Sequence, residues 1–294
     1  MRKDLTEQQF AWLIIAPAII IVFGIVIYPL VQTFLYSLED IDLSAGKTGA
    51  FVGIANYVET LSDRAFWESL GRTAYFAAVS ILLELVLGVF IALLLNEKFF
   101  GKTLLSGIVI IPWAVPTIVN AAMWKWIYQP EYGALNALLT QLHLIGEYKS
   151  WLGEPLLAMN MIILADVWKM TPLIVIFILA ALQMVNKSVY EAAAVDGAGV
   201  IRRFFSITLH YLKPIFLVLV VIRTLEAIKV FDIIYATTRG GPANGTMVIT
   251  FQAYLKAFNN LQFSKGATYS YLIALIILLL TVVYAKVLKR GEET

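Results

Sequence analysis

Two triplets in the sequence have the residue types of an ATP-binding loop, Gly46-Lys47-Thr48 and Gly101-Lys102-Thr103. A phosphate-binding loop needs another glycine five residues before the glycine of the triplet, because its backbone amides surround the phosphates. Those two positions hold Ile41 and Asn96. No set of residues for nucleophilic catalysis is assembled elsewhere. The sequence therefore predicts that the chain is not an enzyme and binds no cofactor of its own.

The segment Glu191–Gly199 has a pattern that a plain connecting loop does not need. Ser188 lies three residues before Glu191, the spacing of a capping box at a helix start. Alanines follow, and Gly197 can take the left-handed conformation that ends a helix. A helix that only rests on a membrane surface is the alternative, but such helices carry bulky apolar residues. We predict a short, capped helix that docks on another protein.

A third group of chemically distinctive residues is charged and lies in strongly apolar surroundings. Arg223, Glu226, Lys229 and Asp232 are spaced by three, so that successive members can pair on a helix. At 100° per residue the four wind around the helix, so they cannot all face one pore. Charged residues inside a membrane mark functional sites by default. As candidates for a translocation path we take Asn120, Asp166, Lys169, Arg223, Glu226 and Asp232; pairing with neighbouring helices is the alternative for each, and for Glu84.

The elements that hold these residues are apolar segments long enough to cross a membrane. Of 294 residues, 60% are hydrophobic and 14% are charged, whereas soluble domains are about a quarter charged. Each span needs about 20 mostly apolar residues. The predicted spans are six: Ala11–Leu38, Leu70–Leu95, Leu104–Tyr128, Leu156–Gln183, Ile215–Ala236 and Thr268–Leu288. The predicted fold is an all-α integral membrane protein, and residues 1–294 form one domain.

The distribution of Lys and Arg outside the spans predicts the orientation of the chain. Eleven lie on the side of the two termini and of the loop 184–214, and six lie on the opposite side. The richer side is therefore predicted to be cytoplasmic, with both termini inside. The two histidines then fall on opposite sides of the membrane, and we predict no metal site.

Two further features concern backbone shape. Pro112 and Pro116 lie in the third span, where each removes a helical hydrogen bond and bends the helix. On the outer side, Gly240-Gly241-Pro242 with Asn244 forms a turn that can approach a partner closely. We expect this turn to contact a docking protein; an ordinary turn is the alternative.

Taken in order, these motifs resemble a known family: the inner-membrane permease subunits of binding-protein-dependent ABC importers, in the sugar branch with maltose and glycerol-3-phosphate permeases. The family signature, Glu-Ala-Ala, a glycine and then Ile-x-Leu-Pro, falls on Glu191, Ala192, Ala193, Gly197, Ile207 and Leu209, with His210 in the proline position. The other matching positions are Gly53 with Asn56-Tyr57, Pro112 with Pro116, Trp168 with Thr171-Pro172, Phe231-Asp232 and Gly240-Gly241-Pro242.

The resemblance implies the type I ABC importer permease fold and a transport mechanism. The helix Glu191–Gly197, with Ser188 as its cap and Asp196 within it, would be the coupling helix of the cytoplasmic loop 184–214 and would dock on an ATPase. The implied partners are a homologous second permease subunit, two ATPase copies that bind ATP and Mg, and an extracytoplasmic solute-binding protein. The implied location is a bacterial or archaeal inner membrane, and the implied substrate is a sugar or related polyol. The position of His210 leaves the geometry after Leu209 open.

Two other classes of protein remain as alternatives. A secondary transporter driven by an ion gradient would favour inverted repeats and broken helices around a midplane ion site, and no internal repeat is visible. An intramembrane enzyme would need a nucleophile or a metal set inside the spans.

Overall fold

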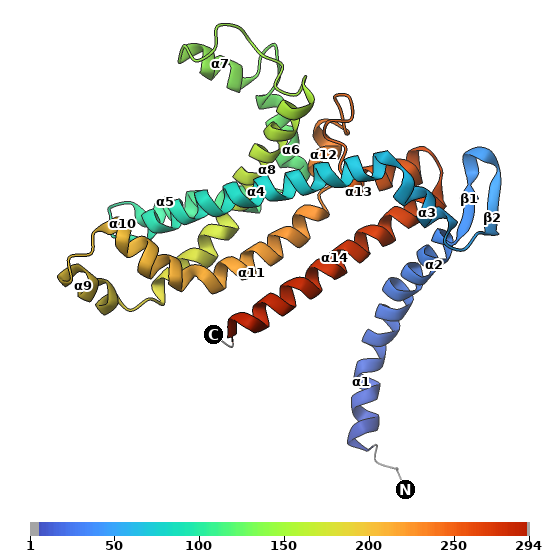
Figure 1. The fold of residues 1–294 in the computed structure, drawn as a ribbon, viewed down its shortest axis with the longest axis horizontal. Helices are drawn as coiled ribbons and strands as arrows, with labels where there is room; N and C mark the ends of the chain where they lie inside the picture. Colours follow the sequence, from blue (N-terminus) through green and yellow to red (C-terminus); the bar gives the residue numbers. More distant parts are fainter. Residues whose placement is uncertain (1–5, 293–294) are drawn as a thin grey trace. The chain divides into compact units, whose positions relative to one another are not determined.

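The computed structural model describes residues 6–292, which fall into two compact units. One unit comprises residues 6–66 and 253–274, and the other comprises residues 67–252 and 275–292. Two long helices, α4 (Arg64–Asn96) and α14 (Phe263–Glu292), contribute to both units (Figure 1).

The first unit contains the N-terminal helices and a small hairpin. Its remaining elements are α1 (Glu7–Ile21), the π-helix η1 (Val22–Ile27), α2 (Tyr28–Ser37), β1 (Glu39–Asp42), the 3-10 turn η2 (Leu43–Ala45), β2 (Lys47–Phe51), α3 (Ala55–Ser62) and the π-helix η4 (Leu255–Asn259). Strands β1 and β2 form an antiparallel hairpin with η2 as its turn. The sequence had not indicated this hairpin. In this turn the Ser44 hydroxyl donates to Asp42 Oδ1 at 2.5 Å, and this bond holds the pKa of Asp42 below its usual value.

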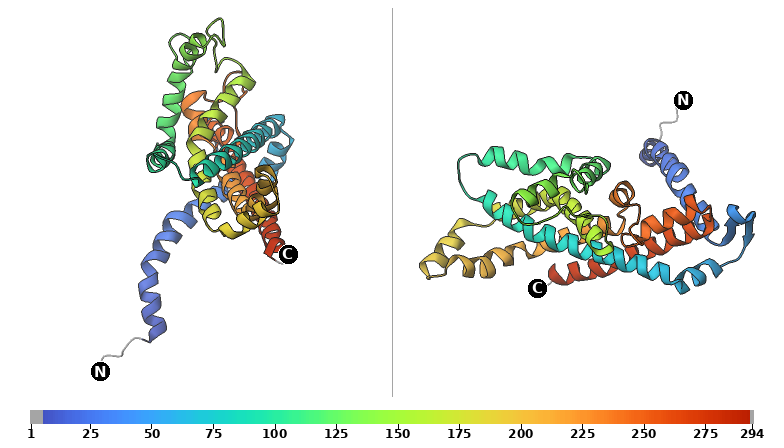
Figure 2. Two further views of the ribbon diagram at one scale, coloured as in Figure 1. Left: turned by 90° about the vertical axis from the view of Figure 1, so that its left-hand side faces the viewer. Right: turned by 90° about the horizontal axis from the view of Figure 1, so that it is seen from above.

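The second unit is a bundle of long helices joined by short ones. Its other elements are α5 (Lys102–Ala114), α6 (Thr117–Ile127), α7 (Ala134–Gln141), α8 (Pro155–Gln183), α9 (Lys187–Val195), α10 (Val200–Arg203), the π-helix η3 (Phe204–Thr208), α11 (Leu209–Ile228), α12 (Asp232–Thr237) and α13 (Ile249–Tyr254). Figure 1 shows α9 beyond the ends of α8 and α11, and in the left view of Figure 2 α7 lies at the top, away from α9.

The described residues contain the six predicted spans. Five continuous helical stretches are long and apolar enough to cross a membrane: Glu7–Ser37, Arg64–Asn96, Pro155–Gln183, Val200–Ile228 and Phe263–Val287. The sixth is the pair α5 and α6, which is bent by 99° at a short break. The predicted bend of the third span is thus confirmed. Pro116 causes the bend, because it is the residue directly before α6. Pro112 lies inside α5 and does not end that helix.

The fifth span differs from the prediction at both ends. It begins at Val200 and not near Ile215, since α10, η3 and α11 form one continuous stretch. Pro214 lies inside α11. The π-helical turn η3 precedes it, and such turns commonly accommodate a local irregularity in a helix. At the other end α11 stops at Ile228, so the predicted helix through residue 236 is wrong.

The core of the second unit lies where α4, α8 and α11 meet. Its fully or nearly fully buried members are Ala92, Leu95, Ile174, Val175, Ile178, Leu182, Leu212 and Leu219. Gly88 of α4 makes this packing possible, because a Cβ atom there would lie 2.4 Å from Ile174 Cγ2. Helices α4 and α8 therefore approach each other closely at Gly88.

Candidate functional site

The loop between α8 and α11 contains a short helix with defined ends. Helix α9 begins after Asn186, whose side chain accepts a hydrogen bond from the Ser188 amide at 3.0 Å. The predicted capping box at Ser188 is therefore wrong. Asn186 supplies the side-chain acceptor two residues earlier, so that Ser188 and Glu191 both lie within the helix.

The C-terminal end of α9 agrees with the prediction. Gly197 has φ +78°, the left-handed conformation that glycine adopts without a steric penalty. The amide of Ala198 donates to the Ala193 carbonyl at 2.9 Å, and the amide of Gly197 donates to the Ala194 carbonyl at 3.1 Å. This pair of bonds is a Schellman motif, which satisfies the last carbonyls of the helix.

Most side chains of α9 are exposed to solvent. Glu191, Ala192 and Asp196 are exposed, Ala193 is half-buried, and Val195 is 89% exposed. Exposed apolar side chains extend on both sides of the helix in the chain: Met184, Val200 and Ile201. Exposed apolar side chains gathered in this way are typical of surfaces that contact another protein or a membrane.

One hydrogen bond connects α9 to the fifth span. The hydroxyl of Tyr190 lies 2.9 Å from Thr208 Oγ1, at the end of η3. Ile207 and Leu209 are half-buried next to it, and Leu209 lines an apolar hollow together with Leu85 and Val89 of α4. The exposed His210 does not interrupt α11, which runs through it.

A cluster of four charged side chains joins α4, α8 and α11 inside the second unit. The Arg223 guanidinium binds both carboxylate oxygens of Glu84, at 2.6 and 2.7 Å. It also donates to Asp166 at 3.1 Å and to Glu226 at 2.7 Å. Arg223 is 2% exposed and Glu84 is fully buried. Two-pronged binding of a carboxylate by arginine is among the strongest polar contacts in proteins, so this cluster fixes the three helices to one another.

The cluster forms one wall of a polar cavity of about 340 Å³, here termed the charged cavity. Besides Asp166, Arg223 and Glu226, its lining includes Lys169, Lys229 and Asp232, together with aromatic residues Phe76, Trp113 and Phe231. Of the four charges spaced by three, only Arg223 and Glu226 form an ion pair with each other among the described residues. Because α11 ends at Ile228, Asp232 belongs to the separate helix α12 and the four do not share one helix.

Asn120 is the one predicted path residue that lies away from this cavity. It is fully buried in α6, where its amide Nδ2 donates to the Ala165 carbonyl of α8 at 3.2 Å. In this conformation Asn120 thus connects two helices. Glu84, which the sequence pointed to only as a charged residue in a span, proves to be the main partner of Arg223.

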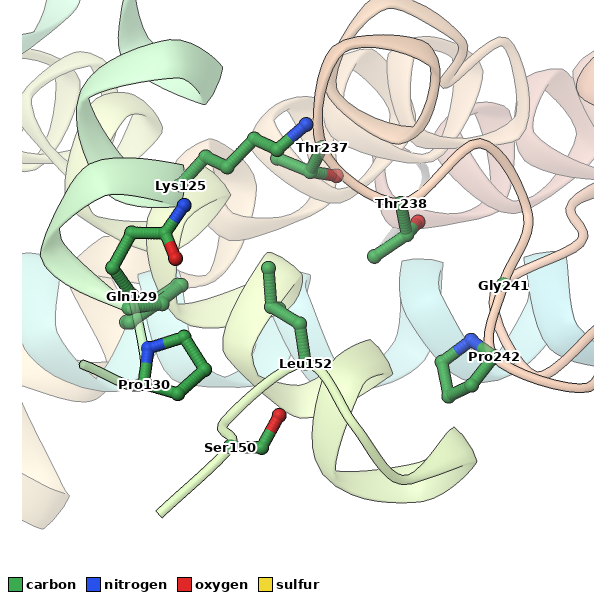
Figure 3. A pocket seen from close by; sticks show the side chains of 10 residues that line it. Lys125, Gln129, Pro130, Ser150, Leu152, Thr237, Thr238, Gly241 and Pro242 are labelled. Carbon is green, nitrogen blue, oxygen red and sulfur yellow. The ribbon is translucent and has the colours of Figure 1, made fainter. Parts of the chain in front are cut away.

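The turn after α12 is held rigidly. Gly240 is buried with φ +84°, and a Cβ atom there would lie 2.6 Å from Met247 Cε. The Thr246 hydroxyl donates to the Gly241 carbonyl at 2.7 Å. Gly241 and Pro242 line a second cavity, shown in Figure 3, while Asn244 is exposed. The buried Gly240 cannot itself contact a docking protein, so only the rest of the predicted docking turn is available for contact.

Comparison with known families gives a match over most of the chain. The model of the family described as "Binding-protein-dependent transport system inner membrane component" matches residues 84–290. The chain belongs to this family. It is therefore a multi-pass membrane transport subunit and not an enzyme, and the match counts against a transporter driven by an ion gradient.

Several curated permeases are similar over nearly their whole length. The trehalose/maltose transport system permease protein MalF of Thermococcus litoralis is 41% identical, over 96% of this chain and 94% of that protein. The sulfoquinovosyl glycerol transport system permease protein SmoG of Agrobacterium fabrum is 33% identical over 98% of this chain and 93% of that protein. Among solved structures, a chain of a bacterial ABC transporter involved in alginate import has a TM-score of 0.83, at 21% identity and 98% coverage of both chains. The permease thus has the type I ABC importer fold.

Proposed function

We propose that this permease is one membrane subunit of an ATP-driven importer that carries a sugar or related polyol into the cytoplasm of a bacterium or archaeon. Its partners are a solute-binding protein, a homologous second permease subunit and two copies of an ATPase that binds ATP and Mg. The permeases that it resembles are named for trehalose and maltose or for a sulfosugar glycoside, and this supports a carbohydrate substrate.

The observation that carries the proposal is the geometry of α9. A helix with both ends hydrogen-bonded, in an exposed loop with small and apolar residues on its surface, is suited to transmit a force. A flexible loop would absorb the same movement. We assign α9, with Glu191, Ala192 and Gly197, as the part that docks on the ATPase.

Transmission from α9 into the membrane follows the Tyr190–Thr208 contact. Thr208 is buried at the start of the fifth span, and Tyr190 is the residue of α9 that reaches it. Movement of α9 therefore acts on the stretch Val200–Ile228 directly. The same stretch carries Arg223 and Glu226, so it joins the docking loop to the charged cavity.

The charged cavity supplies polar groups in and next to the spans for a hydroxyl-rich solute. Lys169, Lys229 and Asp232 line it without an ion pair in the described part of the chain, so their hydrogen-bonding capacity is available. In contrast, Arg223 and Glu84 are already engaged with each other. We assign contact with the solute to the first three and to Glu226, which is paired with Arg223 but has a side chain that is 45% exposed, and helix packing to Arg223 and Glu84.

The test is uptake into proteoliposomes that contain the permease, its second permease subunit and the ATPase. Trehalose accumulation is expected to require internal ATP and the added binding protein, and to be unaffected by collapse of the proton gradient. A Glu191→Lys variant is expected to lose ATPase docking and uptake, whereas Lys187→Gln, at the first residue of the same helix, serves as the control. Uptake that follows a proton gradient without ATP would overturn the proposal.

A further inference from the structure

The cavity in Figure 3 lies apart from the charged cavity, at the other ends of two of the same helices. It has a volume of about 370 Å³ and is here termed the outer pocket. Its lining comes from the end of α6, the loop before α8 and the turn after α12: Lys125, Tyr128, Gln129, Pro130, Ser150, Leu152, Thr237, Thr238, Gly241 and Pro242. Ligand pockets commonly measure about 300–1,000 Å³, so the volume suits a small solute.

One wall of the outer pocket is fixed by a single buried side chain. Asn136 is fully buried, and its Nδ2 donates to the carbonyls of Pro130 at 3.2 Å and Lys149 at 2.9 Å. Its Oδ1 accepts from the Lys149 amide at 3.2 Å and from Trp151 Nε1 at 2.8 Å. Asn136 thereby ties the segment with Gln129 and Pro130 to the segment with Ser150 and Leu152.

The opposite wall is equally fixed. Thr246 bonds both the Thr238 hydroxyl, at 2.6 Å, and the Gly241 carbonyl, at 2.7 Å. A Cβ atom on Gly245 would lie 2.4 Å from Pro155 Cβ, so the turn is packed against the first residue of α8. The pocket is therefore formed before any ligand arrives, which reduces the entropy lost on binding.

The chemistry of the lining matches a pyranose ring. Lys125, Gln129 and Ser150 have side-chain polar groups without a hydrogen-bonding partner in residues 6–292, and together they offer donors and acceptors to hydroxyl groups. In Figure 3, Pro130 and Pro242 lie on opposite sides with Leu152 between them, so apolar faces are available to the ring carbons. Among the residues that the structure describes, no carboxylate lines the pocket, and Lys125 is the one charged residue that does.

The outer pocket and the charged cavity are connected through shared helices. Thr117 at the start of α6 lines the charged cavity, and Lys125 near its end lines the outer pocket. These eight residues correspond to about 12 Å along a helix. Helix α12 has the same arrangement: Asp232 at its start lines the charged cavity, and Thr237 at its end lines the outer pocket.

We infer that the outer pocket binds one pyranose unit of the sugar before the sugar enters the charged cavity. This inference rests on the proposed function and on the orientation predicted from the Lys and Arg distribution, in which this end of α6 lies on the outer side of the membrane. It adds to that function a holding site in the permease itself, distinct from the site in the binding protein.

The chain has no cysteine, so a thiol placed in the pocket reports on that place alone. In the reconstituted importer without binding protein, Ser150→Cys is labelled with a membrane-impermeant maleimide, and the rate is followed on this subunit. Trehalose is expected to slow the labelling at least several-fold. The matched control is Gln141→Cys, at the exposed end of α7 and outside the pocket, where trehalose is expected to change nothing.

A second variant tests the assigned contact. Adding Gln129→Ala to Ser150→Cys removes one hydrogen-bonding side chain and is expected to raise the trehalose concentration for half protection about 2- to 10-fold. Adding Gln141→Ala to Ser150→Cys instead is expected to leave the trehalose concentration for half protection unchanged.

Three results would overturn the inference. One is unchanged labelling of Ser150→Cys at saturating trehalose. Another is protection by sn-glycerol 3-phosphate but not by trehalose, which would make the pocket an anion site. The third is protection by sugar-free binding protein alone, which would mean that a protein loop fills the pocket. Normal ATP-dependent trehalose uptake by the parent importer in the same preparation shows that only this inference has failed and the proposed function stands.

Discussion

The buried cluster around Arg223 predicts a large loss of stability when the arginine is removed. An Arg223→Leu variant leaves Glu84 fully buried with neither of its two hydrogen bonds to the guanidinium, and it also removes the bond to Asp166. Breaking a buried ion pair from one side costs about 3–5 kcal/mol, because an uncompensated charge stays buried. Total stabilities are only about 5–15 kcal/mol, so the variant is expected to be poorly folded at moderate temperature.

The assay is equilibrium unfolding in detergent, followed by circular dichroism, with a double-mutant cycle. In Glu84→Leu/Arg223→Leu the uncompensated carboxylate of Glu84 is gone, so the double variant is expected to be about 1–3 kcal/mol more stable than Arg223→Leu alone. Arg72→Met is the control. It removes a more exposed i,i+4 pair with Glu68, which is expected to be worth about 0.3–0.5 kcal/mol. Equal small effects of Arg223→Leu and Arg72→Met, or a double variant less stable than either single one, would refute the structural role of the cluster.

Three further predictions concern backbone geometry and coupling. Gly197→Val forces a branched residue into a left-handed position at a cost of at least about 1–2 kcal/mol, and should reduce co-purification of the ATPase; Gly199→Ala, where φ is −65°, should not. Tyr190→Phe removes the hydroxyl contact with η3, and should lower the amount of sugar imported per ATP hydrolysed while the ATPase still co-purifies; an unchanged ratio would contradict the assigned route. Gly88→Ala places a methyl group 2.4 Å from Ile174 and should destabilise the bundle by about 1–3 kcal/mol, with partial rescue by Ile174→Ala as the check by thermal unfolding.

The sequence alone predicted the spans well because their signal is local. Twenty apolar residues in a row identify a membrane helix wherever it packs, and Pro116 breaks the third span through its own backbone chemistry. Gly197 was predicted for the same reason, since a glycine after an alanine-rich stretch is a local signal for a helix end. These features depend on residues close together in the chain.

Other features depend on residues far apart in the chain, and the sequence could not supply them. Glu84 and Arg223 are 139 residues apart, and their pairing exists only because α4 and α11 pack together. Competition between nearby residues also misled the prediction, since Asn186 caps α9 in place of Ser188. The outer pocket had only a partial signal in the sequence, the turn with Gly241 and Pro242, because residues from three segments far apart in the chain form it.

The arrangement of α11 supports the proposed coupling of docking to translocation. At its beginning the Tyr190–Thr208 contact connects it to α9, and toward its end Arg223 ties it to α4 and α8. Asp166 belongs both to the cluster and to the lining of the charged cavity. A displacement of α9 therefore cannot move α11 alone; we expect α4, α8 and α11 to move as one body and to carry one wall of the charged cavity with them. Asp232 of α12, which we propose contacts the solute, lies beyond the break at residues 229–231, so this wall can move against it without unfolding a helix.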